Sequence, residues 1–287
     1  RNGQSIIMAV TSELVKQLRD KTGAGMMDCK KALDETNGNM ELAIEVLRKK
    51  GAATAAKRAD KTANEGTIVA KISDDGKRGV MVEINCETDF VARGEDFTSF
   101  AQSVAQIAFD KSPATVEELH ALPHPNGKTV SDALSELIGK VGEKIEIRRL
   151  LSLRSEGGFL EQYVHMGAKI GVIVELGAEL NPSNKTIARD IAMQVAAMSP
   201  IVVSRDNVNK ELVDKELEIY RTQAKNEGKP DQIADKIANG RLEKYYQEVV
   251  LLEQSFIKDA GKMVKDLLSP NVSVKQFKRF QLGESMN

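Results

Sequence analysis

The stretch Glu83-Ile84-Asn85-Cys86-Glu87-Thr88-Asp89-Phe90-Val91-Ala92-Arg93 decides the fold of its region, because it begins as one kind of structure and ends as another. Apolar and polar side chains alternate up to Cys86, which predicts a strand. The alternation stops at Thr88, where an acid and an aromatic residue follow, and Gly94 breaks the chain before a helix. Asp89 and Phe90 at the rim of a sheet either pack inward or are presented to a partner. The spacing alone slightly favours inward packing.

The pattern of this region occurs twice in the chain. Residues 65–84 read as a β-hairpin followed by a helix near 97–108, and residues 156–176 with a helix near 187–198 repeat that design. Two such segments predict two related α+β subdomains. The second copy ends in residues 177–181 without an Asp-Phe pair, and this difference shifts the balance toward a role for the pair beyond the core.

The remaining segments complete an α+β chain of several domains. Apolar residues at helical spacing predict three short helices within residues 8–50. The Ala-rich, basic stretch over 51–64 has good helix propensity but no clear apolar face, so we expect a solvated helical linker there. We expect the first core subdomain at 65–142 and the second at 143–204, with 143–150 as a strand of the second sheet. Two apolar seams around Gly228-Lys229-Pro230 predict an antiparallel coiled-coil insertion at 205–248. Residues 249–287 complete the second subdomain, and 1–7 read as an added segment ahead of a natural start at Met8.

The composition is that of a soluble protein with an evenly balanced charge. Hydrophobic residues make up 41% and charged residues 29%, and 41 basic residues face 42 acidic ones. A nucleic-acid binder usually carries a basic excess, so we do not expect direct nucleic-acid binding. The longest apolar runs fall short of the roughly 18 residues that a membrane span needs. With neither a span nor a leader, we expect a cytoplasmic protein in which Cys29 and Cys86 are free thiols.

The sequence contains no recognisable catalytic constellation. The three histidines, at positions 120, 124 and 165, are not part of a metalloprotease motif, and the sequence has no hydrolase motif and no phosphate-binding glycine motif. We therefore expect neither an enzyme nor a bound cofactor or metal. Met26 and Met27 start a helix, and at least one of them must point away from a narrow apolar stripe. An exposed Met suits adaptable recognition.

Two long motifs resemble those of one family. Residues 18–33, from Leu18-Arg19-Asp20-Lys21 to Lys31-Ala32-Leu33, resemble the first signature of the bacterial elongation factor Ts family, and residues 83–93 resemble the second. The order of parts is similar as well, and the resemblance covers roughly residues 8–284. It implies a guanine nucleotide exchange factor that binds elongation factor Tu in its GDP form and promotes GDP release during translation elongation. It also implies that the small helical domain is of the ubiquitin-associated (UBA-like) type.

The resemblance also implies which residues contact the partner. In the helical domain these are Arg19, Met26 and Met27. In the second hairpin they are His165, Lys169, Ile170 and Gly171. The segment that would disturb the partner's magnesium site comprises Thr88, Asp89, Phe90 and Val91.

Two other readings of the sequence stay open. One is a non-catalytic scaffold that forms a homodimer through the coiled coil or the core. The other is an RNA-binding translation protein that uses the basic linker at residues 57–61. With the resemblance, presentation of Asp89 and Phe90 becomes the favoured reading.

Overall fold

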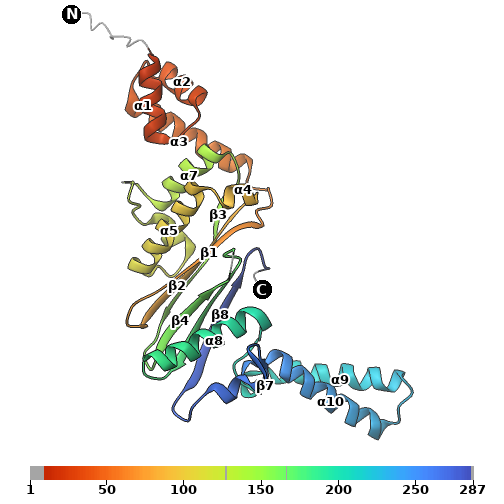
Figure 1. The fold of residues 1–287 in the computed structure, drawn as a ribbon. Coiled ribbons are helices and arrows are strands. Elements are labelled where there is room, and N and C mark those ends of the chain that lie inside the picture. The colour runs from red at the N-terminus through yellow and green to blue at the C-terminus, as the bar shows by residue number, and fades with distance from the viewer. Residues whose placement is uncertain (1–9, 127, 166, 286–287) are drawn as a thin grey trace, which may run out of the picture. The chain divides into compact units, whose positions relative to one another are not determined.

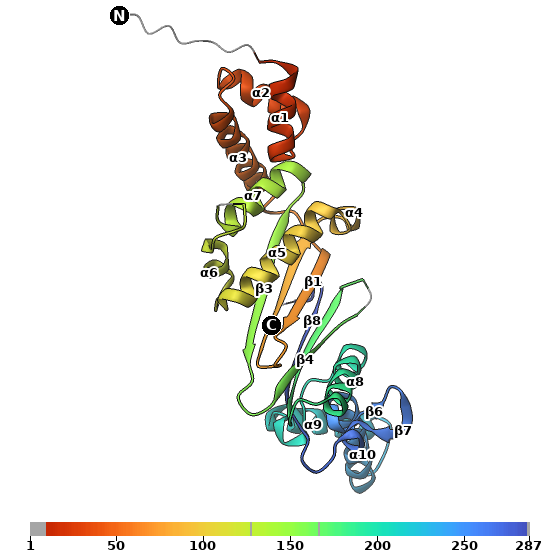
Figure 2. The same cartoon turned by 60° about the vertical axis from the view of Figure 1, so that its left-hand side comes forward.

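The computed structural model describes residues 10–126, 128–165 and 167–285, so the predicted added segment at 1–7 lies outside them. These residues form two compact units (Figures 1 and 2). The first contains residues 10–69, 80–152 and 281–285, and the second contains 70–79 and 153–280. Among the described residues, no helix has the length and apolar character needed to cross a membrane.

The N-terminal bundle consists of three helices, as predicted: α1 (Ser12–Thr22), α2 (Met26–Glu35) and α3 (Met40–Lys57). Two side chains cap the free backbone N–H groups at the helix starts. Thr11 accepts a hydrogen bond from the amide of Leu14, and Asn39 accepts one from Leu42. The small core of the bundle is formed by Val15, Leu18, Cys29, Ala32, Leu33 and Ala43.

The predicted linker is in part a continuation of α3, and the expectation that it is solvated is wrong at Gly51. This glycine is buried against α7 (Val130–Val141), where a Cβ atom would lie 2.3 Å from the carbonyl oxygen of Ser135. A Cβ atom at Gly139 of α7 would lie 3.0 Å from the Cα atom of Gly51. Two glycines thus let two helices approach closely, and the ion pair between Arg48 and Asp132 adds a polar contact.

The strand predicted at residues 143–150 belongs to a different sheet from the one expected. Strand β3 (Ile145–Arg154) pairs in the order β1-β2-β3 with β1 (Glu65–Ile72) and β2 (Arg78–Cys86). The prediction that it joins the second sheet is therefore wrong. Alternation specifies a strand but not its neighbour. Here a side-chain contact accompanies the pairing, because Nε of Arg149 lies 2.6 Å from Oε2 of the buried Glu83.

Four helices accompany the β1-β2-β3 sheet: α4 (Asp89–Ala92), α5 (Glu95–Lys111), α6 (Val116–Ala121) and α7. The apolar face of β2 packs on α5, as the alternation predicted. Glu83 lies on the opposite face, where it also accepts a hydrogen bond from the amide of Gly283 at 2.8 Å. The last described residues of the chain are thereby held on the first unit. The core of this unit includes Val82, Ile84, Cys86, Phe97, Phe100, Val104, Leu134, Leu137, Ile145 and Ile147.

The second unit repeats the plan of a hairpin and a helix. Strands β4 (Phe159–Val164), β5 (Ile170–Gly177) and β8 (Ser273–Gln281) form a sheet in the order β4-β5-β8. β4 and β5 are antiparallel, with Phe159 opposite Leu176 and Val164 opposite Gly171. Helix α8 (Pro182–Met198) packs on this sheet through Ala188, Ile191, Ala192 and Val195.

A helical hairpin extends from the second unit at the predicted place. It consists of α9 (Lys210–Asn226) and α10 (Asp231–Val249), and Gly228 takes a positive φ of 78° in the turn between them. A 3₁₀ turn at Arg205–Asn207 precedes the hairpin, and short elements follow it: β6 (Ser255–Phe256), β7 (Asp259–Met263) and 3₁₀ turns at Leu251–Glu253 and Val264–Leu267. The described part of the chain is therefore α+β, as the sequence predicted.

Candidate functional site

The segment that opened the sequence problem forms a short, exposed helix. In α4 the side chain of Phe90 is 85% exposed, and Asp89 is exposed beside it. Val91 and Ala92 are half-buried and pack against the edge of the core. Of the two arrangements that the sequence left open, inward packing is thus excluded for the Phe90 ring. Among the large apolar side chains of the described residues, Phe90 is the most exposed.

A helix of four residues does not hold its shape by itself, because helix nucleation is unfavourable and one turn adds few hydrogen bonds. Thr88 caps α4, with its Oγ1 accepting from the amide of Val91 at 3.3 Å. Thr88 is fixed in turn by Glu143, whose carboxylate accepts from the Thr88 amide at 3.1 Å and from Oγ1 at 2.8 Å. The thiol of Cys86 also donates to the carbonyl of Thr88, over 3.2 Å.

Glu87, the residue before the cap, is also fixed by hydrogen bonds. Oε1 of Glu87 accepts from the amide of Lys144 at 2.6 Å, and both of its oxygens accept from Nη1 of Arg58, at 2.7 and 2.8 Å. The hydrogen bond from the Lys144 amide, followed by the Arg58 guanidinium, holds the pKa of Glu87 below its ordinary value. Burial raises the pKa of the neighbouring Cys86 thiol to about 12, so that it stays protonated and unreactive.

Asp89 is exposed to solvent beside the ring. Its carboxylate forms an ion pair with Arg93 one turn further on, and both side chains are largely exposed. Such a pair contributes little to stability in water and can open readily. A shallow hollow lined by Asp89, Phe90, Arg93 and Gly94 adjoins the ring.

In the bundle, the three residues implied as contacts are all on the surface. Arg19 is exposed, and Met26 and Met27 are 56% and 64% exposed. The sequence required only one of the two Met residues to point outward, and the structure exposes both. Leu42 of α3 is 50% exposed as well. Sequence reasoning missed Leu42 because its spacing fits the apolar stripe of α3.

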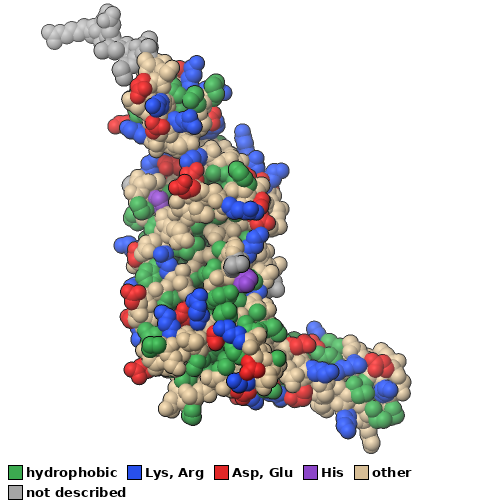
Figure 3. All heavy atoms as spheres, viewed as in Figure 1, with side chains coloured by type: hydrophobic (Ala, Val, Ile, Leu, Met, Phe, Trp, Pro, Cys, Tyr) green, Lys and Arg blue, Asp and Glu red, His purple; other side chains and the backbone are tan. Residues whose placement is uncertain are grey.

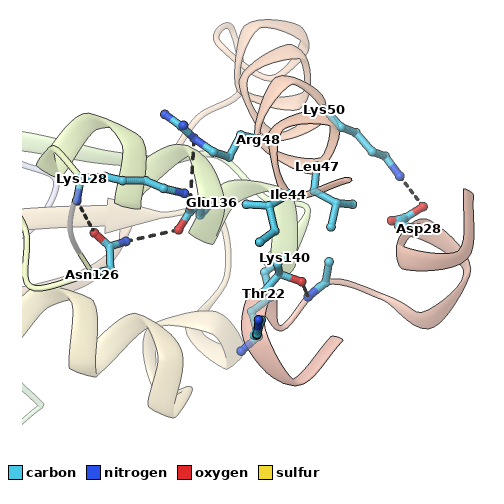
Figure 4. A pocket seen from close by; sticks show the side chains of 13 residues that line it. Thr22, Asp28, Ile44, Leu47, Arg48, Lys50, Asn126, Lys128, Glu136 and Lys140 are labelled. Atoms are coloured by element: carbon cyan, nitrogen blue, oxygen red, sulfur yellow. Dashed lines mark hydrogen bonds and ion pairs between the residues drawn. The ribbon is translucent and has the colours of Figure 1, made fainter. Parts of the chain in front are cut away.

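A cavity of about 300 Å³ lies between the bundle and α7 (Figure 4). Ile44, Leu47 and several charged side chains line it. Four of its cations already have carboxylate partners, so most of the positive charge in the cavity is compensated. The pairs are Lys50 with Asp28, Lys128 with Glu136, Arg48 with Asp132, and Lys140 with Asp96.

The residues implied in the second hairpin flank the turn between β4 and β5. His165 and Lys169 are exposed, Ile170 is half-buried, and Gly171 is buried within β5. Because it is buried, Gly171 offers little surface to a partner. Nδ1 of His165 lies 2.9 Å from the hydroxyl of Tyr163, and this hydrogen bond fixes the imidazole.

Sequence reasoning missed a largely apolar cavity in the second unit. A cavity of about 310 Å³ beside His165 is lined by side chains from β4, α8 and the residue that follows β6, including Tyr163, Met193 and Ile257. Their positions in the sequence are far apart, and only the fold brings them together. Met198 and Ile201 are exposed in the same unit.

Within the part of the chain that the structure describes, no cluster of three or more His, Cys, Asp or Glu side chains could hold a metal ion. On the face drawn in Figure 3, acidic and basic side chains are interspersed. Cys29 and Cys86 are both free and buried, as predicted.

Comparison with known proteins assigns the chain to a family. The family model described as Elongation factor TS matches residues 87–284, from Glu87 just before α4 to the last residues of the described chain. This chain belongs to the elongation factor Ts family. The family that the two sequence motifs resembled is thereby confirmed.

Curated relatives named elongation factor Ts extend the match over the bundle. The relative from Chlorobium phaeobacteroides (strain BS1) is 51% identical over 284 residues, which cover 96% of this chain and 99% of the relative. The relative from Chlorobium limicola (strain DSM 245 / NBRC 103803 / 6330) is 52% identical over 285 residues with the same coverage. The relative from Prosthecochloris aestuarii (strain DSM 271 / SK 413) is 51% identical over 284 residues. Members of this family are translation elongation factors by name.

Proposed function

We propose that this protein is a guanine nucleotide exchange factor that binds elongation factor Tu in its GDP form and promotes GDP release during translation elongation. The observation that carries the proposal is the exposed Phe90 ring, on a helical turn fixed by hydrogen bonds, in a chain of the elongation factor Ts family. The fixed position of this turn supports the proposal, because a side chain that separates parts of a partner binds better when it is already oriented before binding.

Exchange requires no covalent chemistry by this protein. If the exchange factor and GDP each weaken the binding of the other to the GTPase, the coupling is reciprocal and the complex of all three loses GDP quickly. Each 1.4 kcal/mol of such coupling changes an equilibrium about tenfold. This agrees with a surface that offers an apolar ring and a carboxylate.

In this proposal Phe90 is the wedge and Asp89 acts on the metal site of the partner. The ring would insert beside the nucleotide site, and Thr88 and Val91 would hold the turn that carries it. Asp89 would leave Arg93 and compete for the hydrogen bonds of the water molecules around the partner's magnesium ion. The weak, exposed pairing of Asp89 with Arg93 suits that transfer.

Two further contacts would orient the complex. The bundle, which we take to be UBA-like, would dock on the GTPase domain through Arg19, Met26 and Met27. The β4–β5 turn would make a second contact through His165 and Lys169. The α9–α10 hairpin would act as a coiled-coil arm, and the protein would work in the cytoplasm.

The proposal is tested with purified elongation factor Tu loaded with a fluorescent GDP derivative. We expect the wild-type chain to accelerate GDP release strongly and Phe90→Ala to lose most of that acceleration. Loss of an anchor of this kind costs about 2 kcal/mol or more, which corresponds to roughly thirtyfold or more in rate. Circular dichroism should show an unchanged fold, because the ring contributes little to the core.

The matched control is Leu180→Ala, which truncates another exposed apolar side chain, located after β5. It should release GDP as the wild type does. Wild-type rates for Phe90→Ala would contradict the wedge. Absence of any acceleration by the wild-type chain would contradict exchange activity itself.

A further inference from the structure

We propose that Glu143 is a positioning residue for nucleotide exchange, through a reciprocal clamp that fixes the direction in which α4 presents Phe90. The inference rests on the proposed function for its consequence in exchange, but the clamp itself can be tested on the isolated chain. Glu143 lies outside the motifs that the sequence singled out, and it is 53 positions beyond Phe90 in the chain.

The clamp joins two short connectors. Glu87 and Thr88 are the two residues between the end of β2 and the start of α4, and Glu143 and Lys144 are the two between the α7 cap Gly142 and the start of β3. Each connector leaves backbone groups without a regular partner, because it belongs to neither a helix nor a strand. The side chain of one connector can satisfy the backbone of the other.

The hydrogen bonds show this exchange in both directions. The carboxylate of Glu143 accepts from the amide of Thr88, and the carboxylate of Glu87 accepts from the amide of Lys144. A third bond, from Oγ1 of Thr88 to Oε1 of Glu143, leaves the same Oγ1 free to accept from the amide of Val91. The cap of α4 is therefore part of the clamp.

The other described anchors of α4 are the bond from the Cys86 thiol to the Thr88 carbonyl, the link to α5 through Gly94, and the apolar contacts of Val91 and Ala92, so its orientation also depends on the clamp. Val91 and Ala92 are only half-buried, while Asp89 and Phe90 face solvent. A rotation of the turn about its two anchoring apolar contacts would redirect the Phe90 ring and leave the core intact. Glu143 opposes that rotation because its two oxygens bind two different atoms of Thr88.

Arg58 reinforces the clamp from a third segment. Its guanidinium contacts both oxygens of Glu87. Arg58 is also the residue that caps the C-terminus of α3, so the clamp connects α4 to the helix that belongs to the bundle. Hydrogen bonds to carboxylates are stronger than those between neutral groups, and each of the two glutamates contributes such bonds.

The first experiment measures the mobility of α4 without a partner. The chain contains no Trp, so Phe90→Trp provides a single fluorescent reporter on α4. In that background Glu143→Ala should lower the tryptophan anisotropy, because the turn is released. Glu143→Gln should restore part of it, since an amide oxygen can still accept one of the two bonds. Glu117→Ala, which removes an exposed glutamate on α6, is the matched control and should leave the anisotropy unchanged.

The second experiment measures GDP release in the background with the native Phe90. Losing two hydrogen bonds that hold the site should slow release about fivefold to tenfold for Glu143→Ala, and less for Glu143→Gln. Glu117→Ala should match the wild type. Raising the concentration of the Glu143→Ala chain should not restore the maximal rate, because the defect is in the orientation of the wedge and not in docking.

The outcomes separate the clamp from the exchange proposal. Unchanged anisotropy in Glu143→Ala overturns the clamp. Lowered anisotropy with wild-type GDP release, while Phe90→Ala is slow, overturns the positioning role and leaves the exchange function standing. If Phe90→Ala itself releases GDP at the wild-type rate, the role of Glu143 in exchange fails together with the wedge, and the anisotropy still decides whether Glu143 holds α4.

Discussion

At the scale of single residues, carboxylates determine much of the local structure around the site. Glu83 is buried and is compensated by Arg149 and the amide of Gly283, while Glu87 and Glu143 hold the connector before α4. Burying a carboxylate is costly unless it is paired and hydrogen-bonded. Glu83 meets that condition, and the partly buried Glu87 and Glu143 are also hydrogen-bonded to partners that are distant in the sequence.

The lowered pKa of Glu87 predicts a pH dependence of stability. Its folded pKa lies below the ordinary value of about 4.3, so the ionised form stabilises the fold above that pH, and this contribution is lost as the pH falls through the folded pKa. Glu87→Gln should cost about 1 kcal/mol at pH 7, and the difference from the wild type should shrink below about pH 4. Urea unfolding at a series of pH values measures it.

The control for this prediction is Glu156→Gln, an exposed glutamate in the turn before β4. Its free energy of unfolding should follow the wild type at every pH. A cost of Glu87→Gln that stays constant from pH 7 to pH 3 would contradict the assignment of the effect to the ionised Glu87.

At the scale of elements, the contact between α3 and α7 depends on two facing glycines. A methyl group at Gly51 would lie 2.3 Å from a backbone oxygen of α7. Because the clash is with the backbone, a change of side-chain rotamer cannot relieve it. Helix propensity alone would favour Ala at this helical position. The close approach of the two helices reverses that preference.

We therefore expect opposite effects from the same substitution in two helices. Gly51→Ala should lower the free energy of unfolding by about 1–3 kcal/mol, because the helices must move apart. Gly240→Ala in α10, where a Cβ would meet nothing within 4 Å, should raise it by about 0.5–1 kcal/mol. Thermal and urea unfolding of the two variants measures both effects. Equal effects of the two substitutions would mean that α3 and α7 do not pack as described.

At the scale of the whole molecule, the hairpin is a peripheral part of the second unit. Its base is a separate apolar cluster that includes Leu242, Tyr246 and Val250, distinct from the sheet core around Val172 and Ile191. Further out, the two helices are linked by exposed ion pairs such as Arg221 with Asp235. Such pairs contribute little to global stability.

Replacing residues 219–240 by a short Gly-containing turn should therefore leave both cores folded. The base cluster is retained, so we expect a cooperative thermal transition within a few degrees of the wild type, with the helical signal reduced in circular dichroism. Sedimentation of the same variant tests the alternative reading of a homodimer, which should be lost if the arm mediates it. A chain that loses its cooperative transition would contradict the peripheral role.

The sequence predicted the elements better than their neighbours. The three bundle helices, the strand ending at Cys86 and the helical hairpin follow from periodicity and turn residues, which act over a few positions. The sheet partner of residues 145–154 did not follow, because alternation is the same in either sheet. The burial of Gly51 was missed for a similar reason, since it depends on α7, some 80 residues further along the chain.

The sequence by itself determined the family, the α+β class and the segment Thr88–Val91 as the feature to explain, because motifs and periodicity are local properties. Only the tertiary structure decided that Phe90 faces solvent and that Glu143, Lys144 and Arg58 hold its turn. Those contacts join residues that lie 29 to 57 positions apart in the chain. The sequence shows that a carboxylate can accept hydrogen bonds, because this follows from the residue type. The fold determines which backbone group donates to it.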